Sequence, residues 1–192
     1  MNKKLIFLPF FIQEKIKKGK LKKSYERELS LLIADVSGYT AMSERLDAET
    51  VTERINKLFS DYFEIIQKYR GDIYKFMGDA VIIFFEGKNK ERRALKCAQE
   101  IVKETEKYKK WEISVKCAIS TGKCLLYFAG NEKRKEFFIT GKAYENITIL
   151  EKKAEKKEIV VCDMTFKKIA KSENLKTSPF CEDNLKYFKI KS

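Results

Sequence analysis

The sequence predicts one α+β domain, on the basis of three observations. Short apolar runs are separated by two long amphipathic segments, the pattern of strands separated by helices. A tight Gly78-Asp79 turn joins two neighbouring apolar runs, as in a β-hairpin. The resulting order is β-α-β-β-α-β with extra C-terminal elements. This order favours a ferredoxin-like sandwich with helices on one face of the sheet.

The first half of the chain supplies most of this core. Residues 29–33 form an apolar run that predicts a buried strand. Residues 48–69 and 91–109 repeat apolar side chains at three- and four-residue spacing, so both are expected to be amphipathic helices. The hairpin strands between them are expected at 72–77 and 80–85.

The second half predicts further strands and two helices. Thr121-Gly122-Lys123 separates two apolar runs and predicts a turn between two strands. Gly141 is expected to open a helix. The expected strands are 111–119, 124–129, 135–140, 158–162 and 185–190, and the expected helices are 141–155 and 164–171.

Length and composition define the expected domain organisation. The 192 residues, 44% of them hydrophobic, fit one domain at 26–170 with an N-terminal basic and apolar extension at 1–25. A C-terminal extension at 171–192 is expected to pack on the domain. The apolar run at 5–12 is too short to span a bilayer and no cleavage site follows it. We therefore expect no transmembrane segment and a cytoplasmic location, with peripheral membrane attachment as the alternative.

Charge and residue content exclude several function classes. The formal net charge is +13, which can indicate a nucleic-acid or anionic-membrane partner. The basic runs at 15–23 and 152–157 lack interleaved aromatic side chains for stacking on bases, which disfavours nucleic acid. The sequence has no histidine, so histidine triads and histidine-metal sites are excluded. Five cysteines without a CxxC spacing fit a reduced protein.

Two aspartates are candidate metal ligands. Asp35 ends the first strand and Asp79 lies in the hairpin turn, so the two carboxylates meet at one end of the sheet if these strands are neighbours. Like charges repel at short range, and a hard divalent cation relieves this repulsion. Gly38 then allows a tight turn into a helix, whose first N–H groups bind phosphate well. Each piece alone is also typical of a plain turn or helix cap.

The segments "ADVSGYTAMSERL" and "GDIYKFMGDAVIIFF" together resemble the catalytic domain of class III nucleotidyl cyclases. The similarity is greatest to the first catalytic half of the bicarbonate-responsive soluble adenylyl cyclases, and it covers roughly residues 28–165. It implies conversion of ATP to cyclic AMP and pyrophosphate.

The resemblance also assigns site residues. It implies two Mg²⁺ or Mn²⁺ ions per complete site, held by Asp35, Asp79 and the backbone carbonyl of Val36. The phosphate-binding positions are Gly38, Tyr39, Thr40 and Lys116.

Other family positions are not filled in this sequence. The helix after Gly141 carries Glu145 and Ile149 where second halves of the family carry an asparagine and an arginine. An acid and an aliphatic side chain lack the donors needed to stabilise the transition state. We therefore expect a second cyclase-like half as partner, in a heterodimer or in the same longer chain, and a poorly active homodimer.

Lys75 has two interpretations under the resemblance. Its position reads adenine in homodimeric relatives, while in soluble-cyclase first halves the same lysine lines a degenerate site for bicarbonate. The second cationic contact of that degenerate site falls on Thr148, so bicarbonate regulation is not predicted.

The sequence is compatible with three classes of function. The first is the metal-binding half of an adenylate cyclase. The second is a catalytically incomplete pseudo-cyclase that holds nucleotide as a regulatory module. The third is a basic ferredoxin-like RNA-binding module, which would need aromatic side chains on a sheet face.

Overall fold

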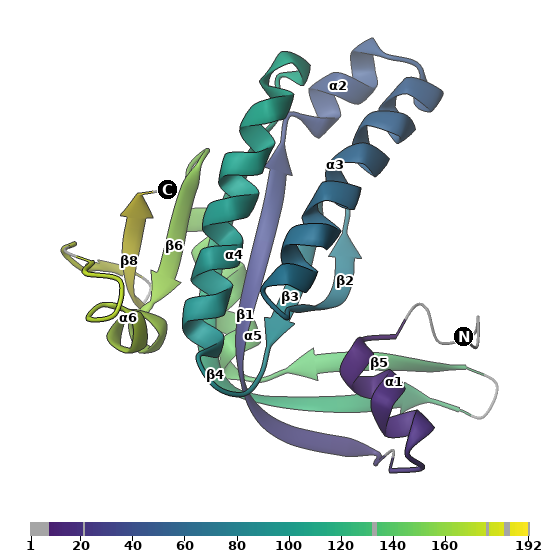
Figure 1. Cartoon of the computed structure of the whole chain (residues 1–192), viewed down its shortest axis with the longest axis vertical. Coiled ribbons are helices and arrows are strands. Elements are labelled where there is room, and N and C mark those ends of the chain that lie inside the picture. Colours follow the sequence, from purple (N-terminus) through teal and green to yellow (C-terminus); the bar gives the residue numbers. More distant parts are fainter. Residues whose placement is uncertain (1–7, 21, 132–133, 176, 183–184, 192) are drawn as a thin grey trace.

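A computed structural model of the chain describes residues 8–20, 22–131, 134–175, 177–182 and 185–191. One eight-stranded sheet with the order β2-β3-β1-β4-β6-β8-β7 forms its centre, and β5 pairs with β4 outside this path (Figure 1). The helices are α1 (Phe10–Lys17), α2 (Tyr39–Arg45), α3 (Ala48–Lys68), α4 (Lys90–Thr105), the 3₁₀ helix η2 (Glu106–Trp111), α5 (Lys142–Lys153) and α6 (Asp163–Ile169). The strands are β1 (Ser24–Ser37), β2 (Asp72–Met77), β3 (Ala80–Phe85), β4 (Ser114–Gly130), β5 (Lys135–Thr140), β6 (Glu158–Cys162), β7 (Phe180–Glu182) and β8 (Leu185–Lys191).

The expected β-α-β-β-α-β core is confirmed as β1-α3-β2-β3-α4-β4. Strand β1 lies at its centre and is antiparallel to both β3 and β4. The C-terminal elements extend the sheet beyond β4, because β6 is parallel to β4 and antiparallel to β8. The short exposed strand β7 was not predicted, since three exposed residues carry no alternation of apolar and polar side chains.

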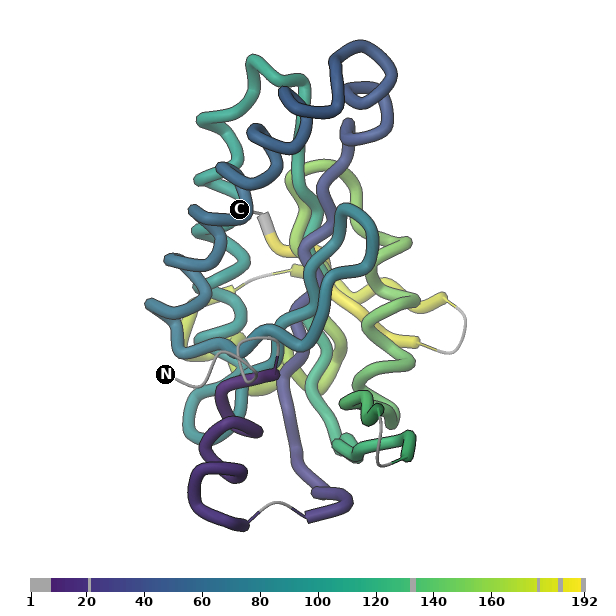
Figure 2. The backbone as a smooth tube through the Cα atoms, turned by 90° about the vertical axis from the view of Figure 1, so that its right-hand side faces the viewer, coloured from purple at the N-terminus to yellow at the C-terminus, as the bar shows by residue number. Residues whose placement is uncertain are grey.

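The expectation that helices cover only one face of the sheet is wrong. Leu32 and Ala34 of β1 belong to the apolar core that contains α3 and α4. Leu31 and Ile33 point to the opposite face, where α1 and α5 contribute to a second core. Figure 2 shows the strands between the blue and teal helices on one side and the green helix α5 on the other. The sheet is therefore buried on both faces. The apolar residues of the helices did not indicate which face each helix covers.

The predicted turn at residues 121–123 is also wrong, because β4 runs through it as one strand. The partner strand β1 pairs with β4 along its whole length, with Leu29 opposite Gly122. The glycine has a packing role here: a Cβ atom at Gly122 would lie 3.4 Å from the Cβ of Ala143 on α5. Glycine inside a strand thus marks a close approach of a helix, as it often does.

The N-terminal segment packs on the domain through α1. Ile12 is fully buried in the core that it shares with α5. The backbone N–H of Phe11 donates a hydrogen bond of 2.9 Å to Oδ2 of Asp72 at the start of β2. No helix within the described ranges is long and apolar enough to cross a bilayer.

Candidate active site

The two predicted carboxylates lie at the same end of the sheet. Asp35 is opposite Ala80 of β3, directly after Asp79 in the hairpin turn. The backbone N–H of Val36 also donates a 3.4 Å hydrogen bond to the carbonyl oxygen of Asp79. The antiparallel pairing of β1 with β3 brings these segments together, which fulfils the condition under which the sequence predicts that the two carboxylates meet.

Asp35 lies on the sheet face that α5 covers. Its neighbours Ala34 and Val36 belong to the core on the α3 and α4 face, so the alternation of a strand directs Asp35 the other way. Lys116 is opposite Asp35 in β4, and Met77 is opposite Ala80 in β2. One row across four strands therefore carries a carboxylate and an ammonium group side by side.

Lys116 is held by two carboxylates. Its Nζ atom lies 3.3 Å from Oδ2 of Asp35 and forms an ion pair with Glu151 of α5. Burial lowers the pKa of Lys116, but the hydrogen bond and charge of Glu151, together with Asp35, outweigh burial and raise it overall. Lys116 is therefore a fixed positive charge beside Asp35. Its assignment as a phosphate contact stays a prediction, and the role of Glu151 was not predicted because no sequence spacing connects it to Lys116.

The β1–α2 turn depends on Gly38. Its φ is +97°, and a Cβ atom there would lie 2.5 Å from the carbonyl oxygen of Glu112. Tyr39 packs partly against the core and Thr40 is exposed. The first N–H groups of any helix lack an intrahelical acceptor, so this turn can present donors to an anion.

Lys75 lies among aromatic rings rather than in open solvent. Its Nζ atom is 4.9 Å from the ring centroid of Tyr74 and 6.0 Å from that of Tyr144 on α5. Cation–π attraction acts at these separations. The hydroxyl of Tyr144 also lies 4.0 Å from the sulfur of Met77. The sequence did not predict the contact with Tyr144, because Tyr144 lies on α5, which is distant from Lys75 along the chain and meets it only in the folded domain.

The α5 positions that differ from the family pattern offer no cationic or amide donor. Glu145 is exposed and forms an ion pair with Lys142 at 3.4 Å. Thr148 donates its hydroxyl hydrogen to the carbonyl of Glu145 at 2.9 Å. Ile149 is half-buried and has no polar side-chain atom.

The available ligands fit a hard cation. Asp35, Asp79 and the carbonyl of Val36 supply only oxygen atoms, which suit Mg²⁺ better than a transition metal. The part of the chain that the structure describes contains no group of three or more acidic, histidine or cysteine side chains that could hold a metal alone. Such a pair of carboxylates suits Mg²⁺ together with substrate phosphates.

The family model described as adenylate and guanylate cyclase catalytic domain matches residues 21–186, and the chain belongs to this family. The chain is 28% identical over 149 residues to adenylate cyclase type 10 of Rattus norvegicus, a match that covers 68% of this chain. That match spans only 9% of the length of the relative.

Solved structures support the same fold. The adenylyl cyclase CyaB from P. aeruginosa superposes with a TM-score of 0.77 at 23% identity, over 90% of this chain and 97% of that one. The guanylyl cyclase Cya2 gives a TM-score of 0.77 at 19% identity, over 88% and 94% of the two chains. The chain is thus a nucleotidyl cyclase catalytic domain, related to both adenylyl and guanylyl cyclases.

Proposed function

We propose that this chain is the metal-binding half of an adenylate cyclase site, which converts ATP to cyclic AMP and pyrophosphate. The observation that carries the proposal is the position of Asp35 and Asp79 at the end of two paired strands. Lys116 already pairs with Asp35, and a divalent cation between Asp35 and Asp79 would neutralise the remaining negative charge at this end of the sheet.

In this reaction Asp35, Asp79 and the carbonyl of Val36 would hold Mg²⁺ or Mn²⁺. Two such ions stabilise the attacking and the leaving oxygen of an in-line displacement at phosphorus. The backbone N–H groups of the turn from Gly38 to Thr40 would bind the phosphates. Lys116, held beside Asp35 by Glu151, adds a positive charge on the same face.

A complementary half would supply what α5 lacks. Donors that face the developing charge of the transition state must be positioned in advance. Glu145 and Ile149 provide none, and two copies of this chain in a symmetric pair would build two identical clefts with the same deficiency. We therefore propose that catalysis needs a second cyclase-like half that carries the asparagine and the arginine.

The preference for ATP rests on two supports. The curated relative with 28% identity is named an adenylate cyclase. Lys75 is a cation, whereas the resemblance to class III cyclases implies an acid at this position in guanylate-forming relatives. Its contacts with Tyr74 and Tyr144 hold it on the face that carries Asp35.

The proposal is tested by titrating a non-hydrolysable ATP analogue against the wild type and Asp79→Asn, with Mn²⁺ and with EDTA. Metal-dependent affinity should fall about tenfold or more in the variant, because a charged ligand contributes more than a neutral one. Asp47→Asn is the matched control: Asp47 caps α3 by accepting the N–H of Thr50, and asparagine caps equally well. Equal affinity in Asp79→Asn and the wild type would refute the metal-site assignment.

A second candidate function is favoured by the same α5 residues. A pseudo-cyclase would hold a metal–nucleotide complex at Asp35 and Asp79 without turnover, because Glu145 and Ile149 leave the transition state without donors. Binding experiments do not separate this candidate from the first. Activity in the presence of a complementary half does.

A further inference from the structure

A basic cavity lies at the end of the sheet opposite to Asp35. It has a volume of about 690 Å³ and lies between the end of α3, the loop after β3 and the first turns of α4. Strand β3 ends beside it at Phe85, which pairs with Ser30, whereas Asp35 pairs with Ala80 at the other end of the same strand. Figure 1 shows this lower end of α4 far from α2. The cavity is therefore separate from the candidate active site.

Positive side chains dominate the lining of this cavity. Among its lining residues Glu86 is the single acid. The cationic lining residues are Lys68, Arg70, Lys88, Arg92, Arg93 and Lys96.

Arg93 is a fixed positive charge in this lining. Its guanidinium donates hydrogen bonds to the carbonyl oxygens of Tyr69 at 3.2 Å and Arg70 at 2.9 Å, and also to that of Glu86. These neutral acceptors hold the side chain but do not cancel its charge. Burial, and then the nearby charge of Arg70, lower the pKa of Arg93, although an arginine stays protonated. The fold thus anchors the guanidinium of Arg93 to the backbone of Arg70, and both residues contribute positive charge to this lining.

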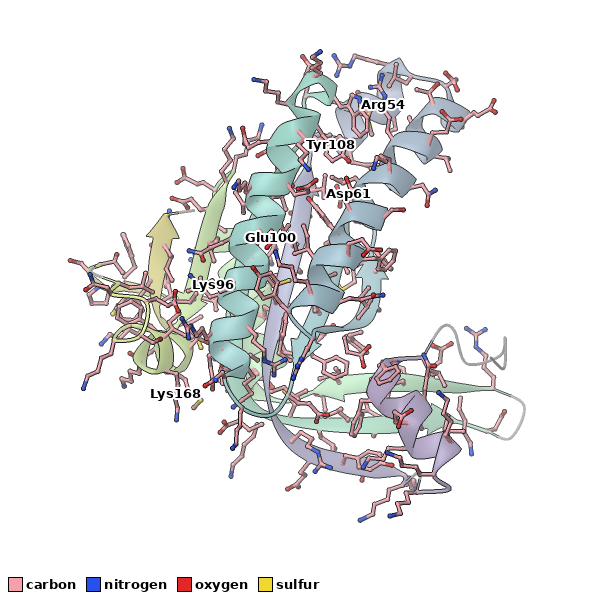
Figure 3. All side chains as sticks on the ribbon, in the orientation of Figure 1. Arg54, Asp61, Lys96, Glu100, Tyr108 and Lys168 are labelled. Carbon is pink, nitrogen blue, oxygen red and sulfur yellow. The ribbon has the colours of Figure 1, made fainter. Side chains whose placement is uncertain are left out.

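The neighbouring carboxylates neutralise only part of the positive charge. Lys68 binds Glu100 at 2.7 Å, and Arg92 and Lys96 share Glu173 at 2.5 Å each. Figure 3 labels Lys96 and Glu100 along α4. Within the described ranges, Arg70 and Lys88 form no ion pair. Both side chains are exposed at the cavity, so their charges are available to a ligand.

We propose that this cavity binds a small phosphate-bearing anion with at least two negative charges. The volume is within the range of about 300–1,000 Å³ typical of small-molecule sites. The guanidinium of Arg70 can bind two phosphate oxygens at once, and Lys88 adds a point charge from the opposite loop. A soluble polyphosphate and the phosphorylated headgroup of a lipid share this chemistry. Bound there, such an anion would contact the end of α3 and the start of α4, and α4 packs on β1, the strand that carries Asp35.

The test is a calorimetric titration of the full chain with tripolyphosphate in EDTA, where the carboxylates of the candidate active site repel the anion. A second arm measures sedimentation with phosphatidylcholine vesicles, with and without a phosphatidylinositol phosphate. The variant is Arg70→Ala combined with Lys88→Ala. The control is Lys109→Ala combined with Lys110→Ala, which removes two exposed lysines at the far end of the same helical segment. Circular dichroism establishes that both variants fold.

The wild type and the control should bind the anion equally, and affinity should fall about tenfold or more in the cavity variant, since it loses two charge-assisted contacts. Binding of free tripolyphosphate would identify a soluble ligand, and binding only to the phosphoinositide vesicles would identify a lipid headgroup. Equal losses in the two variants would overturn the proposal, because they would indicate diffuse surface charge. Absence of binding in both arms would overturn it as well.

Discussion

Gly38 lies where the backbone is left-handed and a neighbouring chain segment comes close, so a side chain there is strained in two ways. The turn between β1 and α2 combines a φ of +97° with a close approach to the backbone of Glu112. The substitution Gly38→Ala therefore introduces two separate costs. Gly87→Ala is the matched control: Gly87 has a φ of +81°, and a Cβ atom there would have no neighbour within 4 Å.

The two costs can be estimated separately. A left-handed conformation costs an L-residue about 1–2 kcal/mol, and both variants bear this cost. At Gly38 the new Cβ atom would lie 2.5 Å from the carbonyl oxygen of Glu112, where ordinary contact begins at 3.4 Å. The backbone must therefore shift, which adds about 1–3 kcal/mol. The free energy of unfolding should fall by about 2–5 kcal/mol in Gly38→Ala and about 1–2 kcal/mol in Gly87→Ala.

Urea unfolding followed by circular dichroism measures both values. The midpoint should fall clearly further for Gly38→Ala than for Gly87→Ala, with a similar slope in all three proteins. Equal destabilisation by the two substitutions would refute the close contact with Glu112. The left-handed backbone conformation would then account for the whole destabilisation caused by Gly38→Ala.

Two further predictions concern the β2 strand. Lys75→Glu should weaken binding of an ATP analogue relative to a GTP analogue, because it replaces the cation beside Tyr74 and Tyr144 with an acid; an unchanged ratio of the two affinities would assign Lys75 to the degenerate site or to surface. Burial raises the pKa of Asp72 above its usual value of 3.8, although the N–H of Phe11 opposes the shift. The folded state therefore holds this proton more tightly than the unfolded state does, and stability contributed by Asp72 falls as pH rises from about 3.8 through the raised pKa. Asp72→Asn, which keeps an acceptor for Phe11, should raise the melting temperature at neutral pH and lose this advantage below pH 3.8; the same gain at both pH values would contradict the pKa assignment.

Local sequence patterns predicted the elements of the core more reliably than their arrangement. The hairpin around Gly78 and Asp79 and the helix from Ala48 were predicted because turn chemistry and apolar spacing act within a few residues. The turn at Gly122 was wrongly predicted because the pairing of β1 with β4, a long-range interaction, outweighs a local preference for a turn. The prediction that all helices lie on one face was wrong for the same reason, because the position of α5 depends on long-range packing.

In the candidate site, too, local features could be predicted from the sequence and long-range contacts could not. The positions of Asp35 and Asp79 followed from strand ends and from the resemblance to cyclases. The ion pairs of Lys116 with Asp35 and Glu151 depend on the register of β1 with β4 and on the packing of α5. No spacing along the chain encodes these contacts, so only the assembled sheet reveals them.

The proposed role of this chain is to supply metal ligands to a cyclase site that a complementary half completes. The most direct measurement is cyclic AMP production from ATP and Mn²⁺ by the purified chain, alone and mixed with a cyclase second half that carries the asparagine and the arginine. The Asp79→Asn chain with the same second half is the control. Losing one preorganised donor costs about a hundred- to a thousand-fold in rate, so the chain alone should be near background. Activity should appear with the second half and disappear in the control. High activity of the chain alone would contradict the claim, and no activity in any mixture would favour the pseudo-cyclase.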